Sequence, residues 1–372
     1  MNELEKRMNI KNEYLSCYAC RDNEAIRLKE SDKDIRTDFF RDIDKIIYSL
    51  SYIRYIDKTQ VFSLKDNDHI SRRMIHVQMV SRIARTIGRA LGLNEDLIEA
   101  ASLGHDLGHV PFGHVGERIL NDISVRNGEG YFNHNVQSAR LLMNVEHNGN
   151  GSNICLQTLD AIMCHNGEIE LEKYEPMKKD KDMFLKEYED TYKDNNVSKK
   201  LRPMTLEGCV VRISDIISYI GRDIEDAVLL GVLKKEDIPS SITDVLGNNN
   251  SDIINTIITD IIDNSMGKPY IEMSPKVFKA LKDLKKFNYD HIYSVANSKE
   301  EIDNYTKMFN GLFDVLLNQI ENNIDSNVNN IFLKNMSKDY LKNTSNKRKV
   351  IDYIAGMTDD YFINEYNLYC KK

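Results

Sequence analysis

Apolar residues recur at intervals of three and four positions along most of this chain, and the alternating pattern of a half-buried strand is rare. Only six prolines and eighteen glycines interrupt its 372 residues. In the stretch "MIHVQMVSRIARTIGRALG", His76, Val80 and Ile87 fall on one face of a helix that Gly92 is suited to end. The spacing therefore predicts an all-α protein in which His76 points toward the interior.

The composition is that of a soluble globular protein. Hydrophobic residues make up 41% of the chain, which is enough for one large domain or two closely packed ones. The chain has no apolar run of about 18 residues, and its charged start lacks the core of a secretory signal. Six scattered cysteines suit a reducing compartment. We therefore expect a cytoplasmic protein that does not contact a membrane.

The formal net charge of −8 argues against nucleic acid as the main partner. One basic stretch stands out, because positions 71–92 hold no acidic residue and five arginines: Arg72, Arg73, Arg82, Arg85 and Arg89. A local patch of this kind is able to hold phosphate groups.

Signals for helix ends divide the chain further. Asn94, followed by two acids, is a good N-cap for a helix that runs to His105, and glycines with Pro111 then break the helical pattern into a loop. A long helix begins near Thr205, and "LGNNNSD" at 246–252 is a turn or linker.

We expect three regions along the chain. They are an N-terminal helical segment at 1–70, a core at 71–235 that carries the chemistry, and a helical C-terminal region at 236–372. More than half of the residues at 168–200 are charged. This stretch predicts a solvated insertion or an exposed helical hairpin within the core.

The densest group of metal-ligating side chains is "HDLGHVPFGH" at 105–114. Helical proteins supply imidazole and carboxylate ligands to a divalent cation from several helices that converge on one point. Asp215 lies mid-helix among valines and isoleucines, and a buried aspartate needs a partner. Each residue alone has a plainer explanation, as a core histidine or an ion-paired carboxylate. Together they predict one metal site formed by His76, His105, Asp106 and Asp215.

Two imidazoles and two carboxylates suit Mn²⁺, Mg²⁺ or Fe²⁺, and the lack of a thiolate argues against a closed structural zinc site. The spacing His…His-Asp…Asp resembles that of the HD superfamily of metal-dependent phosphohydrolases. Further segments resemble its deoxyguanosinetriphosphate triphosphohydrolase-like branch in the same order: "DIRTDFFRDIDKIIYS" (34–49), "DKTQVF" (57–62), "HDLGHVPFGHVGE" (105–117), "FNHNVQSARLL" (132–142), "RISDIISYIGRDIEDA" (212–227) and "DYIAGMTDDY" (352–361). The resemblance covers nearly the whole chain and implies an HD-domain helical phosphohydrolase fold with additional C-terminal helices.

The activity that this resemblance implies is hydrolysis of a deoxynucleoside triphosphate to the deoxynucleoside and triphosphate. Water attacks the α-phosphorus, and the 5′-oxygen leaves. The resemblance carries catalytic positions onto His114, Glu117 and His134, with His109 as a further candidate for phosphate contact or proton transfer. His114 and Glu117 lie one helical turn apart, so the carboxylate is able to orient the imidazole.

The same resemblance places Lys58 and Gln60 of "DKTQVF" near the nucleotide, and helical spacing adds Arg73, Tyr219 and Asp223 as substrate-binding candidates. Arg73 lies one turn before His76, which suits a guanidinium that grips the α-phosphate beside the metal. Tyr219 would stack on or bound the deoxyribose, and Asp223 would accept a hydrogen bond from its 3′-hydroxyl.

Relatives in this branch assemble, and several respond to nucleotides bound away from the active site. We therefore expect a homo-oligomer with a possible nucleotide activator. Five arginines at 71–92 exceed what one triphosphate can use, so a second anion or the carboxylates of a partner subunit would meet them. A solvated arginine face is the alternative.

Three other functions stay open. Another kind of HD phosphohydrolase, acting on nucleoside monophosphates or cyclic nucleotides, would not need the "DKTQVF" and "DYIAGMTD" segments. A non-catalytic deoxynucleotide-sensing protein would not need His114, Glu117 and His134. Nucleic-acid binding has only the arginine stretch in its favour, and the overall acidity weighs against it.

Overall fold

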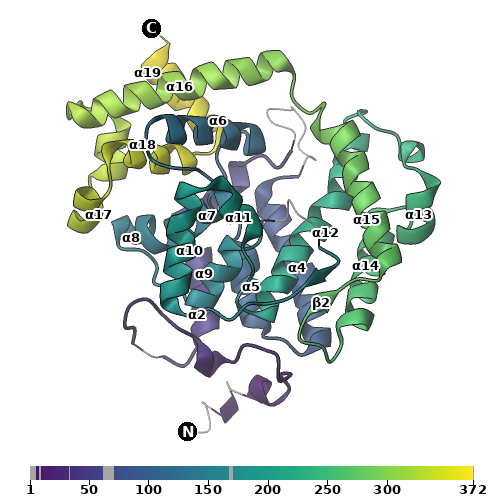
Figure 1. Cartoon of the computed structure of the whole chain (residues 1–372). Coiled ribbons are helices and arrows are strands. Elements are labelled where there is room, and N and C mark those ends of the chain that lie inside the picture. The colour runs from purple at the N-terminus through teal and green to yellow at the C-terminus, as the bar shows by residue number, and fades with distance from the viewer. Residues whose placement is uncertain (1–5, 8–9, 33, 62–70, 167–170, 372) are drawn as a thin grey trace.

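The computed structural model describes residues 6–7, 10–32, 34–61, 71–166 and 171–371. Helices provide nearly all of the regular structure, which confirms the all-α prediction (Figure 1). Within the described ranges the only sheet is a pair of two-residue antiparallel strands, β1 (Lys173–Tyr174) and β2 (Ile271–Glu272). No helix in these ranges has the length and apolar character needed to cross a membrane.

A group of helices around α12 forms the centre of the molecule (Figure 1). α4 packs on both α5 and α12, and α9 packs on α5, α7 and α12. The helices of this group and its edge are α2 (Asp38–Ile47), α3 (Leu50–Ile53), α4 (Arg73–Leu91), α5 (Glu95–Gly104), α7 (His134–Arg140), α8 (Glu146–Gly149), α9 (Leu156–Met163) and α12 (Leu206–Leu229). Short 3₁₀ and π segments are η1 (Ile10–Glu13), η2 (Asp22–Glu24), η3 (Arg54–Asp57), η4 (Leu141–Val145), η5 (Lys235–Asp237), η6 (Tyr289–Tyr293) and η7 (Val328–Leu333).

The expected helix ends are confirmed where the sequence carried a cap. Gly92 ends α4 in the left-handed conformation, with φ of 67°. The Asn94 side chain accepts a hydrogen bond from the Asp96 backbone N–H at 3.2 Å at the start of α5. The Thr205 side chain accepts one from the Gly208 N–H at 3.1 Å at the start of α12. Local hydrogen bonds thus fix where these helices begin and end.

The charged 168–200 stretch forms α10 (Lys181–Lys193) and α11 (Asn195–Lys200), and positions 167–170 lie outside the described residues. It is less solvated than we expected. Phe184 packs in the main core, and the buried Lys179 ammonium group donates to Asp160 at 2.7 Å and to Glu187 at 2.6 Å. Because these opposite charges compensate each other, the segment is able to pack against α9.

The C-terminal region is divided between two hydrophobic clusters. The first cluster joins the central helices to α13 (Ser240–Leu246), α14 (Asn250–Ser265) and α15 (Pro275–Asn288). The second cluster joins α6 (Gly113–Arg126) to α16 (Lys299–Glu321), α18 (Asn346–Ala355) and α19 (Asp359–Cys370) on the opposite side of the molecule (Figure 1), whereas Tyr340 of α17 (Lys338–Asn343) packs in the first cluster. The second cluster also contains Val110 and Phe112 from the "HDLGHVPFGH" loop.

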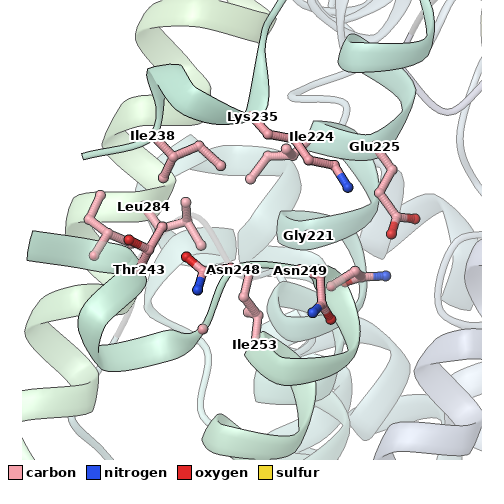
Figure 2. Close-up of a pocket in the computed structure, with 13 residues that line it drawn as sticks. Gly221, Ile224, Glu225, Lys235, Ile238, Thr243, Asn248, Asn249, Ile253 and Leu284 are labelled. Carbon is pink, nitrogen blue, oxygen red and sulfur yellow. The ribbon is translucent and has the colours of Figure 1, made fainter. Parts of the chain in front are cut away.

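The turn predicted at 246–252 is shorter in the structure, because α13 ends at Leu246 and α14 begins at Asn250, and this junction lies against the middle of α12. A Cβ at Gly221 would come within 2.1 Å of Asn250 Oδ1, so a larger residue there would displace the Asn250 side chain. The turn and the helices around it enclose a small cavity of about 20 Å³ that Ile224, Ile253 and Leu284 help to line (Figure 2). This volume has room for about one water molecule, and its lining includes none of the predicted site residues.

A buried carboxylate ties the second cluster to the central helices. Asp352 on α18 receives two hydrogen bonds from Arg140 on α7, at 2.8 and 2.7 Å, and one from Gln137 at 2.9 Å. The Tyr340 hydroxyl donates a further bond at 2.8 Å. Burial disfavours the charged carboxylate, but Arg140 outweighs burial and lowers the pKa of Asp352.

We predict that Asp352→Asn destabilises the fold by about 3 kcal/mol, because it leaves the guanidinium of Arg140 without a charged partner in a nearly buried position. Urea unfolding followed by circular dichroism measures the change. The matched control is Asp314→Asn on the exposed face of α16, which should change the free energy of unfolding by less than about 0.5 kcal/mol. Equal effects of the two substitutions would contradict a structural role for Asp352.

Candidate active site

Asp106 lies at the centre of a buried group of imidazoles. It directly follows His105, which ends α5, and only 3% of its surface is exposed. Five imidazole Nε2 atoms lie within 4 Å of its carboxylate oxygens: those of His76 (3.8 Å), His105 (3.6 Å), His109 (3.5 Å), His134 (3.9 Å) and His165 (3.9 Å). These side chains come from α4, α5, the loop after it, α7 and the end of α9.

The four predicted metal ligands lie together. Besides its distances to Asp106, His76 Nε2 lies 3.0 Å from Asp215 Oδ1 on α12, and His105 Nε2 lies 3.7 Å from the same oxygen. His105 Nδ1 donates to the Ser102 carbonyl at 2.7 Å, so Nε2 of that ring carries the lone pair. Nε2 is buried and has no hydrogen-bond partner among the described residues. This donor set fits a divalent cation.

The predicted metal ligands favour each other's charged forms, because carboxylates and imidazoles of opposite charge lie side by side. Burial disfavours an imidazolium, but Asp215 and Asp106 outweigh burial and raise the pKa of His76. Burial likewise disfavours a carboxylate, but His76 and His105 outweigh it and lower the pKa of Asp215 to about 2. Against the same burial penalty, Arg73 and the surrounding imidazoles hold the pKa of Asp106 well below its ordinary value.

Arg73 is the closest charged neighbour of Asp106. One of its terminal nitrogens, Nη1, donates to the Asp106 carboxylate, and Nη2 donates to the Thr59 carbonyl at 3.0 Å. Its Nε atom is buried and has no hydrogen-bond partner among the described residues. The guanidinium therefore lies beside the predicted metal ligands, as expected from its place one turn before His76.

Glu117 on α6 holds two of the predicted catalytic histidines. Its carboxylate lies 3.1 Å from His114 Nδ1 and 2.8 Å from His134 Nδ1, and it also accepts the His134 backbone N–H at 2.7 Å. Burial opposes its charge, but the imidazoles outweigh burial and hold the pKa of Glu117 well below its ordinary value. Glu117 in turn raises the pKa of His134 against the effect of burial. The carboxylate thus orients both rings.

His114 and His109 differ in surroundings. The His114 side chain is 69% exposed, whereas His109 is buried and its ring stacks on that of His134 with centroids 4.0 Å apart. Burial and the nearby Arg73 charge hold the pKa of His109 well below its ordinary value. His109 is therefore a neutral ring inside the cluster, and His114 is the predicted catalytic residue that solvent reaches.

The unusual composition of the loop has a steric cause. A Cβ at Gly108 would come within 2.3 Å of the His134 carbonyl oxygen and 2.4 Å of the Ser138 nitrogen. The Gly108 N–H donates to Ser138 Oγ at 2.8 Å, and the Ser138 hydroxyl donates to the His105 carbonyl at 2.6 Å. Because glycine permits this approach, the loop lies directly on α7 and brings His134 to Asp106.

The substrate-binding residues predicted near the N-terminus lie next to this loop. Lys58 is 1% exposed, and its ammonium group donates to the carbonyl oxygens of His109 and Ala355, so it joins the loop to α18. Gln60 is half-buried, and its Oε1 accepts no hydrogen bond from the described residues. Phe62, the last residue of "DKTQVF", lies outside the described residues. Direct contact of Lys58 and Gln60 with a nucleotide stays a prediction.

The two residues predicted to contact the sugar lie on α12. Asp223 is 2% exposed and accepts a hydrogen bond at 2.7 Å from the hydroxyl of Tyr293, which lies in η6. Burial raises the pKa of Asp223 to about 7. Tyr219 is half-buried one turn after Asp215. Their contact with a deoxyribose also stays a prediction.

His165 is a member of the cluster that our reading of the sequence did not include. It follows α9 and is 1% exposed, and its Nε2 lies 3.2 Å from His134 Nε2. A signal was present, because a histidine at the end of the apolar run "LDAIMC" has the same placement as His105 at the end of α5. Because His165 is far from the "HDLGH" segment along the sequence, the spacing of residues did not indicate that the two belong to one cluster.

The arginine stretch on α4 is more neutralised than its sequence indicates. Arg85 lies 3.2 Å from Glu95 and 2.9 Å from Glu99, and Arg89 lies 2.9 Å from Glu95. The start of α5 supplies these acids, because α4 and α5 run side by side. With Arg73 paired to Asp106, three of the five arginines have acidic partners among the residues that the structure describes. The excess of positive charge that suggested a second anion is therefore reduced.

Comparison with known families agrees with the fold and with this cluster. Residues 73–220 match the model of the HD domain, and residues 271–368 match that of the phosphohydrolase-associated domain. The first match spans the helices that supply His76, Asp106 and Asp215, and the second spans most of the C-terminal helices. The protein is an HD-domain phosphohydrolase.

Proteins that are similar to this chain along nearly its whole length identify its family within this class. A deoxyguanosinetriphosphate triphosphohydrolase-like protein of Caldanaerobacter subterraneus subsp. tengcongensis is 37% identical, across 95% of this chain and 91% of its own. One from Clostridium perfringens is 38% identical, across 92% and 89%. This chain belongs to the deoxyguanosinetriphosphate triphosphohydrolase-like family.

We predict that Asp106→Ala prevents metal binding, because it removes the carboxylate shared by all the imidazoles of the cluster. The measurement is the metal content, by mass spectrometry, of protein stripped with a chelator, supplied with Mn²⁺ and dialysed. Asp122→Ala, at an exposed position of α6, is the control and should keep its metal. Full occupancy in a folded Asp106→Ala variant would disprove the assignment.

Proposed function

We propose that this protein hydrolyses deoxynucleoside triphosphates to deoxynucleoside and inorganic triphosphate in a metal-dependent reaction. The observation that carries this proposal is the shared carboxylate of Asp106, which lies between the predicted metal ligands and the His109 and His134 rings. The names of relatives that are 37–38% identical across more than nine-tenths of the chain support the substrate class.

His76, His105, Asp106 and Asp215 would hold the metal, for which Mn²⁺, Mg²⁺ and Fe²⁺ are suitable. When bound, the ion would orient the attacking water and offset the negative charge of the α-phosphate. The protein contributes rigidity, because each ligand lies on a packed helix or at its end and His105 is fixed by Ser102.

Arg73 would bind a non-bridging oxygen of the α-phosphate through its terminal nitrogens, in competition with its present bond to Asp106. Water adds to the α-phosphorus, and the bond between phosphorus and the 5′-oxygen breaks. The leaving 5′-oxygen then needs a proton. His114 is suited to deliver it, because Glu117 orients its ring and solvent is able to return the proton.

The deoxyribose would lie along α12, against Tyr219, with its 3′-hydroxyl donating to Asp223. Gln60 offers a buried acceptor next to the loop. Lys58 would act by holding the His109 carbonyl. A homo-oligomeric form and a nucleotide activator are also part of this proposal. They rest on the family resemblance and not on the arginines of α4, because acidic partners neutralise part of that positive charge.

The first product should be tripolyphosphate, because Arg73 and the metal ligands lie together and would fix the α-phosphate. We would incubate each of the four deoxynucleoside triphosphates, singly and mixed, with Mn²⁺ or Mg²⁺ in ¹⁸O-labelled water and separate the products. The label should enter the triphosphate. Orthophosphate as first product would mean attack at the γ-phosphorus, and label in the nucleoside would mean attack at carbon; either result would refute the proposal.

His114→Ala should lower kcat by about 10²- to 10⁴-fold, the usual contribution of a general acid, while metal content and deoxynucleotide binding persist. The exposed ring can be removed without opening a cavity. Glu117→Gln should also lower kcat, since it weakens the orientation of both rings. Asp122→Asn on the same helix is the control and should leave kcat unchanged. Unchanged turnover in both test variants would exclude these roles.

A further inference from the structure

The segment "DYIAGMTDDY" at 352–361 is the part of the family resemblance to which the proposed function gives no task. Within it, Asp359 is the first residue of α19, and only 4% of its surface is exposed. Its Oδ1 accepts the Phe112 backbone N–H at 3.1 Å, and its Oδ2 accepts the Thr59 N–H at 3.3 Å and the Thr59 hydroxyl. One carboxylate of the C-terminal region thus joins two segments that carry predicted site residues.

The contact with Phe112 bears on His114. Phe112 and Gly113 both have left-handed backbones, with φ of 62° and 56°, and His114 follows them in the first turn of α6. A bulky residue disfavours this conformation, which persists only where the surroundings hold it. The hydrogen bond to Asp359 therefore helps to fix the direction in which α6 begins and the place of the His114 ring.

The Thr59 segment has further contacts that hold it in place. Its backbone pairs with Arg72 in an antiparallel bridge, and the Thr59 carbonyl accepts Arg73 Nη2 at 3.0 Å. The Lys58 carbonyl also accepts the Arg73 backbone N–H at 3.2 Å. Loss of the Asp359 carboxylate would therefore leave Arg73 in place, whereas Phe112 would lose the acceptor of its N–H. We expect the effect to fall on the side of His114.

We propose that Asp359 is a positioning residue for the general acid. Through Phe112 it holds His114 at the distance from Arg73 that lets the imidazole reach the leaving 5′-oxygen. A Cβ at Gly113 would lie 3.8 Å from Arg73 Nη2, so the start of α6 lies directly beside the guanidinium that would bind the α-phosphate. This inference rests on the proposed function, and it gives the phosphohydrolase-associated domain a task in catalysis.

The chemistry of the leaving atom separates a positioning role from a purely structural one. When the bond between phosphorus and the 5′-oxygen breaks, the oxygen takes a proton from His114. If sulfur replaces this oxygen, it leaves as a thiolate, a much weaker base than an alkoxide, and its departure needs no general acid. A residue that positions the acid matters for the oxygen substrate alone. A residue that only holds the fold matters for both substrates.

We would measure kcat and KM of the full chain with Mn²⁺, using a deoxynucleoside triphosphate and its analogue with sulfur between C5′ and the α-phosphorus. Asp359→Ala should lower kcat for the oxygen substrate by about 10²-fold, the loss that a displacement of about 1 Å can cause. KM, metal content and kcat for the sulfur analogue should stay at the wild-type values. Asp359→Asn should restore most of the turnover, because its amide oxygen still accepts the Phe112 N–H while its amide nitrogen donates to the Thr59 hydroxyl.

The matched control is Asp360→Ala at the adjacent, exposed position of α19, which should leave both substrates unaffected. His114→Ala should reproduce the pattern of Asp359→Ala. If circular dichroism shows that Asp359→Ala does not fold, Asp359→Ser takes its place, because its side chain is too short to reach both partners.

Equal losses of kcat with the two substrates, or unchanged turnover in a folded variant that lacks the carboxylate and its amide, would overturn the positioning role. A loss with both substrates in His114→Ala would refute the acid itself and the proposal with it. Wild-type protein that forms no triphosphate from any deoxynucleoside triphosphate would instead refute the proposed function.

Discussion

The buried charge of Asp106 is the constraint on which the rest of the site depends. An ionised carboxylate in the interior is costly unless opposite charges and hydrogen-bond donors surround it. Arg73 on α4 provides the opposite charge, and imidazoles from four other elements lie around the carboxylate. The packing of α4 on α5 and of α9 on α7 is therefore also what stabilises this charge.

The C-terminal helices hold the loop that follows Asp106 and carries two of the histidines. Phe112 has a left-handed backbone, with φ of 62°, which is unfavourable for a bulky residue. Its ring stacks on Tyr305 of α16 with centroids 4.2 Å apart, and its N–H donates to Asp359 of α19 at 3.1 Å. Lys58 joins the adjacent His109 carbonyl to α18. The loop that carries the histidines is thus held in its strained form by helices more than 190 positions later in the chain.

The carboxylates of Asp106 and Glu117 divide the histidines into two connected groups. Asp106 faces the Nε2 atoms of the buried rings, and Glu117 holds the Nδ1 atoms of His114 and His134. His134 belongs to both groups, because one carboxylate contacts each of its nitrogens. A substitution at either carboxylate therefore affects the same ring, which explains why metal binding and proton transfer need separate measurements in this protein.

The sequence by itself determined the features that depend on neighbouring residues. Periodicity set the helical class, and caps such as Asn94 and Gly92 set helix ends. The inward-facing His76 and Asp215, with the "HDLGH" segment, indicated the metal ligands that the structure brings together. Tertiary structure alone decided the contacts between distant segments. It added His165 to the cluster, buried Lys58 against two carbonyl groups, and paired Arg85 and Arg89 with acids of α5. These features depend on which helices pack side by side, and packing of that kind leaves no signal in the spacing of residues along one helix.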